Sequence, residues 1–188
     1  MPKIIDVQQY RQELLSKCFD LFAEKGYANV TTRQIAKELG VSTGTLYHYF
    51  PNKQVLFEQL VEQICRQDME VIKQVDKNQT RSQRIEALGQ ILIENQEYII
   101  KQAVIWIDFC QYCSAYKVSD NLLLQIDSRY EQAISELLDL NNPQVAKFIW
   151  ILVDGISINQ IDNSDSFAVQ IELLTQMLIA YFEKHISA

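Results

Sequence analysis

Apolar residues in the first part of the chain recur at alternating steps of three and four. From Val7 to Lys25 they form one stripe of the kind that an amphipathic helix buries, and Gly26 then interrupts the pattern. The sequence therefore predicts a first helix over 7–25.

Two short helices are predicted next. A hydroxyl of Thr31 or Thr32 can cap a helix that ends at Gly40, and Ser42 can cap another that ends before Pro51. The second run is too short to be stable alone, so neighbouring elements must hold it. Two short helices joined by a tight turn with glycine, the second opened by small polar residues, are the helix-turn-helix pattern.

The rest of the chain repeats longer helical stripes. One continuous helix is predicted from Lys53 to Lys73, and further apolar stripes cover Ile85–Val104, 122–138 and 167–182. Asn142-Pro143 is a strong start signal, because Asn caps helices and Pro suits the first turn. Helices therefore account for most of the chain.

Composition supports an all-α fold of about nine helices. The 188 residues include only 5 Gly and 3 Pro, too few for the frequent turns of a β-sandwich or barrel. The predicted organisation is a three-helix head with the helix-turn-helix at 1–53, fused to a larger helical body at 54–188. The two parts are expected to share the helix that begins near Lys53.

Charge is divided unevenly between these parts. Residues 1–55 carry seven Lys and Arg against five Asp and Glu, a net charge of +2, whereas the remainder carries ten against 19, a net charge of −9. This asymmetry is compatible with one end approaching a polyanion. No apolar run is long enough to span a membrane or to form a signal peptide, so we expect a cytoplasmic protein without a membrane partner.

Polar residues in the head have the chemistry of a DNA contact. Ser42, Thr43 and Thr45 are small enough to let a helix enter the major groove, and Gly44 lets the backbone approach closely. Arg33 can form bidentate hydrogen bonds with a guanine base or a phosphate. From composition alone, an equally good interpretation is that this segment is a small helical corner whose polar residues are exposed and do not contact DNA.

The order of the residues favours DNA binding. Three segments, Phe19–Tyr27, Thr31–Ala36 and Gly40–Lys53, closely resemble without gaps the DNA-binding head of TetR/AcrR-family regulators. The resemblance implies an all-helical cytoplasmic homodimer that binds double-stranded DNA at a palindromic operator, usually a repressor released by an unknown small-molecule effector. Gln54 departs from the family, in which an acid often follows the lysine.

The resemblance also implies which residues contact DNA. Phosphate contacts would come from hydroxyl and amino groups, namely Thr31, Thr32, Ser42, Tyr47, Tyr49 and Lys53. Base-edge contacts would come from Arg33, Thr43, Gly44, Thr45 and His48. In this family the last two helices form the dimer interface, which here corresponds roughly to 143–161 and 166–186.

Aromatic and polar residues between positions 98 and 154 are candidates for a ligand pocket. Aromatic walls with a few polar groups suit a small molecule, although aromatic residues at helical spacing are also typical of a packed core. Asp154, if buried, needs a partner, either a cationic ligand or a hydroxyl of the protein. The candidate pocket residues are Tyr98, Trp106, Phe109, Tyr112, Cys113, Tyr116, Trp150 and Asp154.

A rival hypothesis rests on two of the four cysteines. Cys110 and Cys113 have the spacing of a redox motif, which is compatible with a thiol-based redox sensor or oxidoreductase. A thioredoxin-like site should follow a strand, however, and this pair lies in a helical aromatic run. Two buried structural thiols are the alternative. Because the only histidines are His48 and His185 and no Gly-rich phosphate loop is present, we expect no catalysis, cofactor or metal site.

Overall fold

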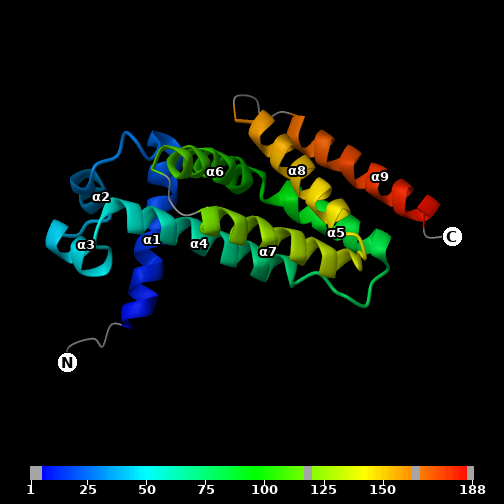
Figure 1. Cartoon of the computed structure of the whole chain (residues 1–188), viewed down its shortest axis with the longest axis horizontal. Helices are drawn as coiled ribbons and strands as arrows, with labels where there is room; N and C mark the ends of the chain where they lie inside the picture. Colours follow the sequence, from blue (N-terminus) through cyan, green and yellow to red (C-terminus); the bar gives the residue numbers. More distant parts are fainter. Residues whose placement is uncertain (1–5, 117–119, 162–165, 186–188) are drawn as a thin grey trace.

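The chain folds into helices throughout the part that the structure describes. A computed structural model describes residues 6–116, 120–161 and 166–185, which contain nine helices (Figure 1). None of these helices is both long and apolar enough to cross a bilayer. In chain order they are α1 (Val7–Lys25), α2 (Thr32–Glu38), α3 (Thr43–Tyr49), α4 (Lys53–Ile72), α5 (Arg81–Glu94), α6 (Gln96–Tyr116), α7 (Asp120–Leu138), α8 (Pro143–Asn159) and α9 (Phe167–His185).

Local capping explains most of these boundaries. The predicted helices of the head and the continuous helix after it are confirmed as α1 to α4. Asn52 caps α4 by accepting the Val55 N–H at 2.8 Å, and Asn142 caps α8 with Pro143 in its first turn. In both caps the side-chain acceptor lies two or three residues before the amide that it binds, so these helix starts could be predicted from the sequence.

The boundary between α5 and α6 is not marked by a Gly or a Pro in the sequence. The apolar stripe Ile85–Val104 is divided between α5 and α6 at Asn95, whose backbone leaves the helical region at φ −106° and ψ 20°. The Asn95 side-chain amide donates to the Ile91 carbonyl at 2.8 Å, which satisfies an acceptor that the helix end leaves open. The bend lets α5 and α6 run in different directions along the body.

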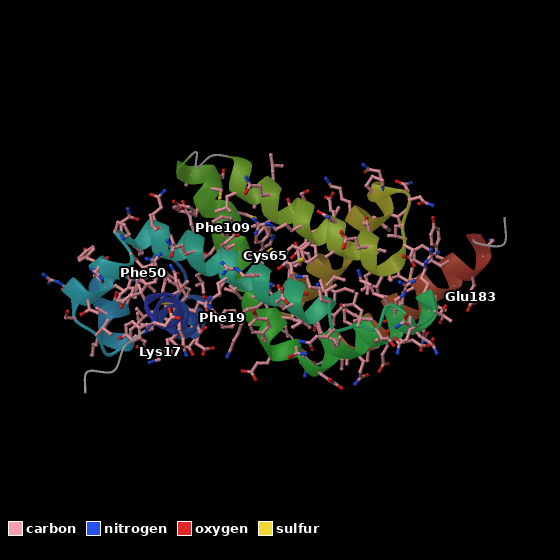
Figure 2. All side chains as sticks on the ribbon, turned by 90° about the horizontal axis from the view of Figure 1, so that it is seen from below. Lys17, Phe19, Phe50, Cys65, Phe109 and Glu183 are labelled. Atoms are coloured by element: carbon pink, nitrogen blue, oxygen red, sulfur yellow. The ribbon has the colours of Figure 1, made fainter. Side chains whose placement is uncertain are left out.

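The arrangement is an elongated molecule with the head at one end (Figure 1). In the body, α5 packs along α9 and α7 packs along α8, while α4 contacts α1, α6 and α7. Figure 2 places Phe50 in the head, Cys65 near the middle and Glu183 toward the opposite end. The helix α4 therefore connects the head to the centre of the body.

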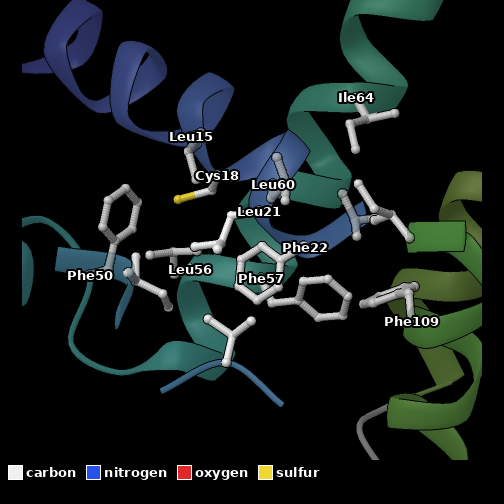
Figure 3. Packing of buried hydrophobic residues seen from close by; sticks show 14 of the residues in the cluster. Leu15, Cys18, Leu21, Phe22, Phe50, Leu56, Phe57, Leu60, Ile64 and Phe109 are labelled. Atoms are coloured by element: carbon white, nitrogen blue, oxygen red, sulfur yellow. The ribbon is translucent and has the colours of Figure 1, made fainter. Parts of the chain in front are cut away.

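A hydrophobic core continues from the head into the body. The rings of Phe22 in α1, Phe57 in α4 and Phe109 in α6 pack in series, with centroids 5.0 and 5.9 Å apart (Figure 3). A second buried cluster lies at the far end around Ile85, Ile149 and neighbouring residues. Because the first cluster includes residues from both parts, the head is packed directly on α4 and α6.

Candidate DNA interface and ligand cavity

The turn between α2 and α3 is fixed by local hydrogen bonds. Thr31 and Gln34 form a capping box, in which Thr31 Oγ1 accepts the Gln34 N–H at 3.3 Å and Gln34 Oε1 accepts the Thr31 N–H at 2.8 Å. Gly40 adopts a φ of +67°, which side chains disfavour, and Ser42 Oγ accepts the Thr45 N–H at 2.9 Å. The relative placement of α2 and α3 thus follows from residues close in sequence.

The short helix α3 turns one side to the core and the other to solvent. Leu46 and Phe50, the residue immediately after α3, are buried, whereas Tyr47 is 52% exposed. The helix contains no carboxylate that would repel phosphate. Among the predicted DNA contacts, Thr31, Arg33, Ser42, Thr43, Gly44, Tyr47 and His48 are exposed, and Thr32, Thr45, Tyr49 and Lys53 are half-buried.

Lys53 is held inside the head rather than extended into solvent. Its Nζ donates to the carbonyl oxygens of Tyr27 at 2.8 Å and Val30 at 2.9 Å, and it lies 4.1 Å from the centroid of the Tyr27 ring. Partial burial lowers the pKa of this ammonium. These contacts fasten the connection between α1 and α2 onto the first turn of α4, a positioning role that the sequence pattern did not reveal.

Replacing Lys53 by Met is therefore expected to weaken the fold and not the phosphate contacts. The variant leaves two carbonyls without their donor, and we expect unfolding to become easier by about 1–3 kcal/mol. The slope of the logarithm of DNA affinity against the logarithm of salt concentration should stay unchanged. Thermal unfolding and salt titrations of DNA binding measure the two effects.

Arg33 provides the matched control for this prediction. Its exposed guanidinium is available to a phosphate or base, so Arg33→Met should leave stability unchanged. If it contacts a phosphate, the salt slope falls by about one unit. A similar fall of the slope in Lys53→Met would contradict the positioning role.

A second connection joins the head to α6. The Tyr27 backbone N–H donates to Asp108 Oδ2 at 2.6 Å, and the Tyr27 ring packs 5.0 Å from that of Tyr112. Nearby, Lys101 of α6 lies 3.0 Å from the carboxylate of Asp20 in α1. The head is therefore tied to α6 as well as to α4.

The body contains a partly open cavity of about 160 Å³ among α4, α5, α6, α7 and α8. Most of its lining is aliphatic, from residues such as Ile64, Leu88 and Ile99. Of the predicted pocket residues, Tyr98, Trp106, Trp150 and Asp154 line this cavity. The sequence analysis missed other polar lining residues, namely Asp68, Asn95, Gln102, Tyr130 and Ser157.

Three other residues that were predicted to line the pocket do not line the cavity. Phe109, Tyr112 and Cys113 belong to the buried cluster between head and body, and they are not among the cavity lining. The rings of Phe109 and Tyr112 pack toward Phe57 because α6 turns this side to α1 and α4. The side chain of Tyr116 lies outside the described residues.

Asp68 is a largely buried carboxylate that has no cationic partner among the described residues. Its Oδ2 accepts hydrogen bonds from the Gln102 amide and the Tyr130 hydroxyl. Burial raises its pKa to about 6, because desolvation outweighs the two hydrogen bonds that favour the charged form. The spacing of Asp68 four residues after Ile64, on the buried stripe of α4, was the signal that could have identified it.

Asp154 lines the same cavity from α8. Burial, assisted by the negative charge of Asp127, raises its pKa to about 6. The Tyr98 hydroxyl also lies in this region, buried and without a hydrogen-bond partner among the described residues. The cavity lining contains no Lys, Arg or His, so its ionisable carboxyl groups have no compensating positive charge there.

The raised pKa of Asp68 predicts a pH dependence of stability. The folded state binds this proton more tightly than the unfolded state, so the contribution of Asp68 to stability is full below about pH 4 and is lost as the pH rises through about 6. Asp68→Asn removes this penalty while retaining an acceptor for Gln102. The variant should be more stable than the parent by about 1–3 kcal/mol at pH 7 and by much less at pH 4.

Urea unfolding at the two pH values measures this difference. The control is Glu86→Gln, which replaces an exposed carboxylate of α5 and is expected to change stability by less than about 0.5 kcal/mol. Equal stability of Asp68→Asn and the parent at pH 7 would show that the carboxylate carries no desolvation penalty.

The cysteines have the properties of structural thiols. None of the four forms a disulfide within the described part of the chain, and Cys113 is buried. Burial first, and the nearby carboxylates of Asp127 and Asp154 next, raise the pKa of Cys110 to about 11. Because the thiolate is the reactive form, this environment suppresses nucleophilic and redox chemistry at neutral pH. No feature of this helical site favours the thiol hypothesis.

A broad apolar surface covers the outer faces of α8 and α9. In α9, Val169, Leu173, Met177 and Tyr181 recur at every fourth position and are each about half exposed or more. The exposed apolar residues of α8 and the segment after it are Phe148, Ile151, Ile158 and Ile161. A contiguous apolar face of this kind marks an interaction surface.

The fold and the head together define a class of protein. An outward helix without carboxylates follows a capped, glycine-containing turn, and the helical body beneath it contains a cavity. This architecture combines a helix-turn-helix head, the motif that places its second helix in the major groove of DNA, with a helical body that contains a cavity.

Comparisons with known proteins relate the N-terminal part of the chain to one family. Residues 14–60 match the family described as bacterial regulatory proteins, tetR family. The chain is 34% identical over 95 residues to the nucleoid occlusion factor SlmA of Glaesserella parasuis, covering 50% of this chain and 47% of that protein. It is 45% identical over 65 residues to SlmA of Haemophilus ducreyi, covering 34% of this chain and 32% of that protein. The chain thus spans less than half the length of these curated relatives.

Solved structures show the same fold over nearly the whole chain. The regulatory protein TetR from Rhodobacter sphaeroides superposes with a TM-score of 0.73 at 18% identity, covering 88% of this chain and 95% of that chain. Residues 14–60 therefore match the tetR-family N-terminal domain, and the chain as a whole shares the fold of this TetR protein.

Proposed function

We propose that this chain is a TetR-family transcriptional regulator, which binds an inverted-repeat operator as a homodimer and acts as a repressor that a small molecule releases. Residues 1–53 serve as the DNA-binding domain, and residues 54–188 bind the ligand and form the dimer. The exposed residues of α2 and α3 support the DNA contact, since small side chains at the start of α3 permit close approach to base edges. The protein is expected to act in the cytoplasm, where it meets chromosomal DNA.

The main support for ligand-induced release from DNA is that α4 and α6 each contact both the head and the cavity. Lys53 begins α4 and fastens the head, while Asp68 in the same helix lines the cavity. In α6, Asp108 binds the Tyr27 amide, and Trp106, two residues earlier, lines the cavity. A ligand that shifts either helix therefore changes the position of the head directly.

Dimerisation supplies the second requirement for such a switch. The apolar faces of α8 and α9 are the surface that a second copy would cover, since together they carry most of the exposed large apolar side chains of the body. A ligand that favours a dimer with misplaced heads by about 1–3 kcal/mol would weaken operator binding by about 5- to 150-fold. Two-fold symmetry places the two heads on equivalent half-sites.

Selection of duplexes from a random pool by the full chain tests the proposal. We expect enrichment of an inverted repeat with half-sites separated by about 34–36 Å or a multiple of this distance. Two chains should bind each duplex. A promoter reporter that carries the selected sequence should give lower output when the protein is present. Enrichment of a single unrepeated site, or of no sequence, would overturn the proposal.

A further inference from the structure

The ionisable groups of the cavity have one sign of charge. Asp68 enters from α4 and Asp154 from α8, and no basic side chain contributes to the lining. The nearest arginine of α7, Arg129, already forms an ion pair with Glu62. Buried carboxylates are ordinarily paired with a cation or fully hydrogen-bonded, because removing their charge from water is expensive.

Neither carboxylate has its bonding capacity filled by the protein. Oδ2 of Asp68 receives both hydrogen bonds, from Gln102 and Tyr130, and none reaches its Oδ1 from the described residues. Among those residues, Asp154 forms no side-chain hydrogen bond or ion pair. Both groups therefore retain acceptor atoms for a donor in the cavity.

Aromatic rings complete the chemistry of the cavity. Tyr130 and Trp150 stack with their ring centroids 3.9 Å apart, and Trp106 and Tyr98 line other parts of the wall. Ring faces attract cations, and the unpartnered Tyr98 hydroxyl offers a further polar contact. An anion would meet two carboxylates without a compensating base and would be repelled.

From these contacts we infer that the cavity binds a compact organic monocation, a protonated or quaternary amine carrying about one ring, with Asp68 and Asp154 as its counter-charges. The volume of about 160 Å³ sets the size, since a cavity of about 150 Å³ accepts benzene. This inference rests on the proposed function, because it names the class of ligand that would cause release.

Three probes of one shape and different charge test the ligand class. They are benzylammonium, its neutral isostere ethylbenzene, and benzoate. The chain contains only two tryptophans, Trp106 and Trp150, and both line the cavity, so intrinsic fluorescence reports occupancy directly. At pH 8, where both carboxyl groups are ionised, we expect benzylammonium to bind at least about tenfold more tightly than ethylbenzene, and benzoate not to bind.

Variants identify the residues that confer this preference. Asp68→Asn and Asp154→Asn should each weaken benzylammonium binding by about tenfold or more and leave ethylbenzene binding unchanged. The exposed Glu86→Gln variant controls for total charge and should bind benzylammonium like the parent. Equal binding of the cation and its neutral isostere, or an equal loss in Glu86→Gln, would overturn the inference.

Operator binding is measured separately with the same protein. If benzylammonium binds but leaves operator affinity unchanged, the ligand class is supported and the proposed release is contradicted. If the protein binds an inverted repeat but shows no preference for the cation, the DNA-binding proposal stands and this inference fails.

Discussion

Replacing both Leu173 and Met177 by glutamate is expected to convert the dimer into monomers and to lower affinity for the full operator by about 100- to 10,000-fold. These side chains are 55% and 60% exposed in the single chain and lie one turn apart on α9. In a symmetric dimer the two substitutions place four carboxylates in an apolar interface, where each pays a desolvation penalty. In the dimer, binding of one head to its half-site holds the second head close to the other half-site. Separate monomers lose this high effective concentration, so their affinity for the full operator falls.

Sedimentation velocity and DNA titrations measure these two effects. Leu124 of α7 is 62% exposed and lies outside the α8–α9 surface, so Leu124→Glu is the matched control and should remain dimeric. Affinity for an isolated half-site should be similar in all three proteins. A double variant that stays dimeric would place the interface elsewhere.

Gly44→Ala is expected to lower operator affinity by about 10- to 100-fold without loss of stability. A β-carbon at Gly44 would meet only Ser42 Oγ, at an ordinary contact distance of 3.6 Å, so the free protein has room for it. Alanine is also the better helix former, by up to about 1 kcal/mol. Any loss of binding must therefore arise where the backbone of α3 approaches DNA.

Calorimetric unfolding and operator titrations separate the two contributions. Gly40→Ala is the contrasting variant, because Gly40 has a φ of +67° and a side chain there strains the turn whatever space is available. It should lower stability, whereas Gly44→Ala should not. Undiminished operator affinity in Gly44→Ala would show that the first turn of α3 does not contact DNA closely.

The elements of the head were predictable because their signals are local. Thr31, Ser42 and Asn52 each cap a helix through an amide three residues away, and Gly40 occupies the left-handed turn. Such contacts depend little on the rest of the chain. The same reasoning correctly placed Pro143 at the start of α8.

The candidate pocket could be predicted only in part. Periodicity places Tyr98, Trp106 and Phe109 on the same helix, but it does not say which neighbour each ring faces. Tyr98 and Trp106 line the cavity, whereas Phe109 packs against Phe57 in the core. The answer depends on how α6 is rotated against α1 and α4.

The helix-turn-helix, its capped boundaries and its exposed residues could be predicted from local patterns, because hydrogen bonds between residues three apart establish the caps. Tertiary structure decided the rest. It brought Tyr130 to Asp68 across 62 positions of sequence, and it directed Lys53 to carbonyls 23 and 26 positions earlier. Burial and charge pairing of this kind depend on which helices become neighbours, and no local pattern encodes that choice.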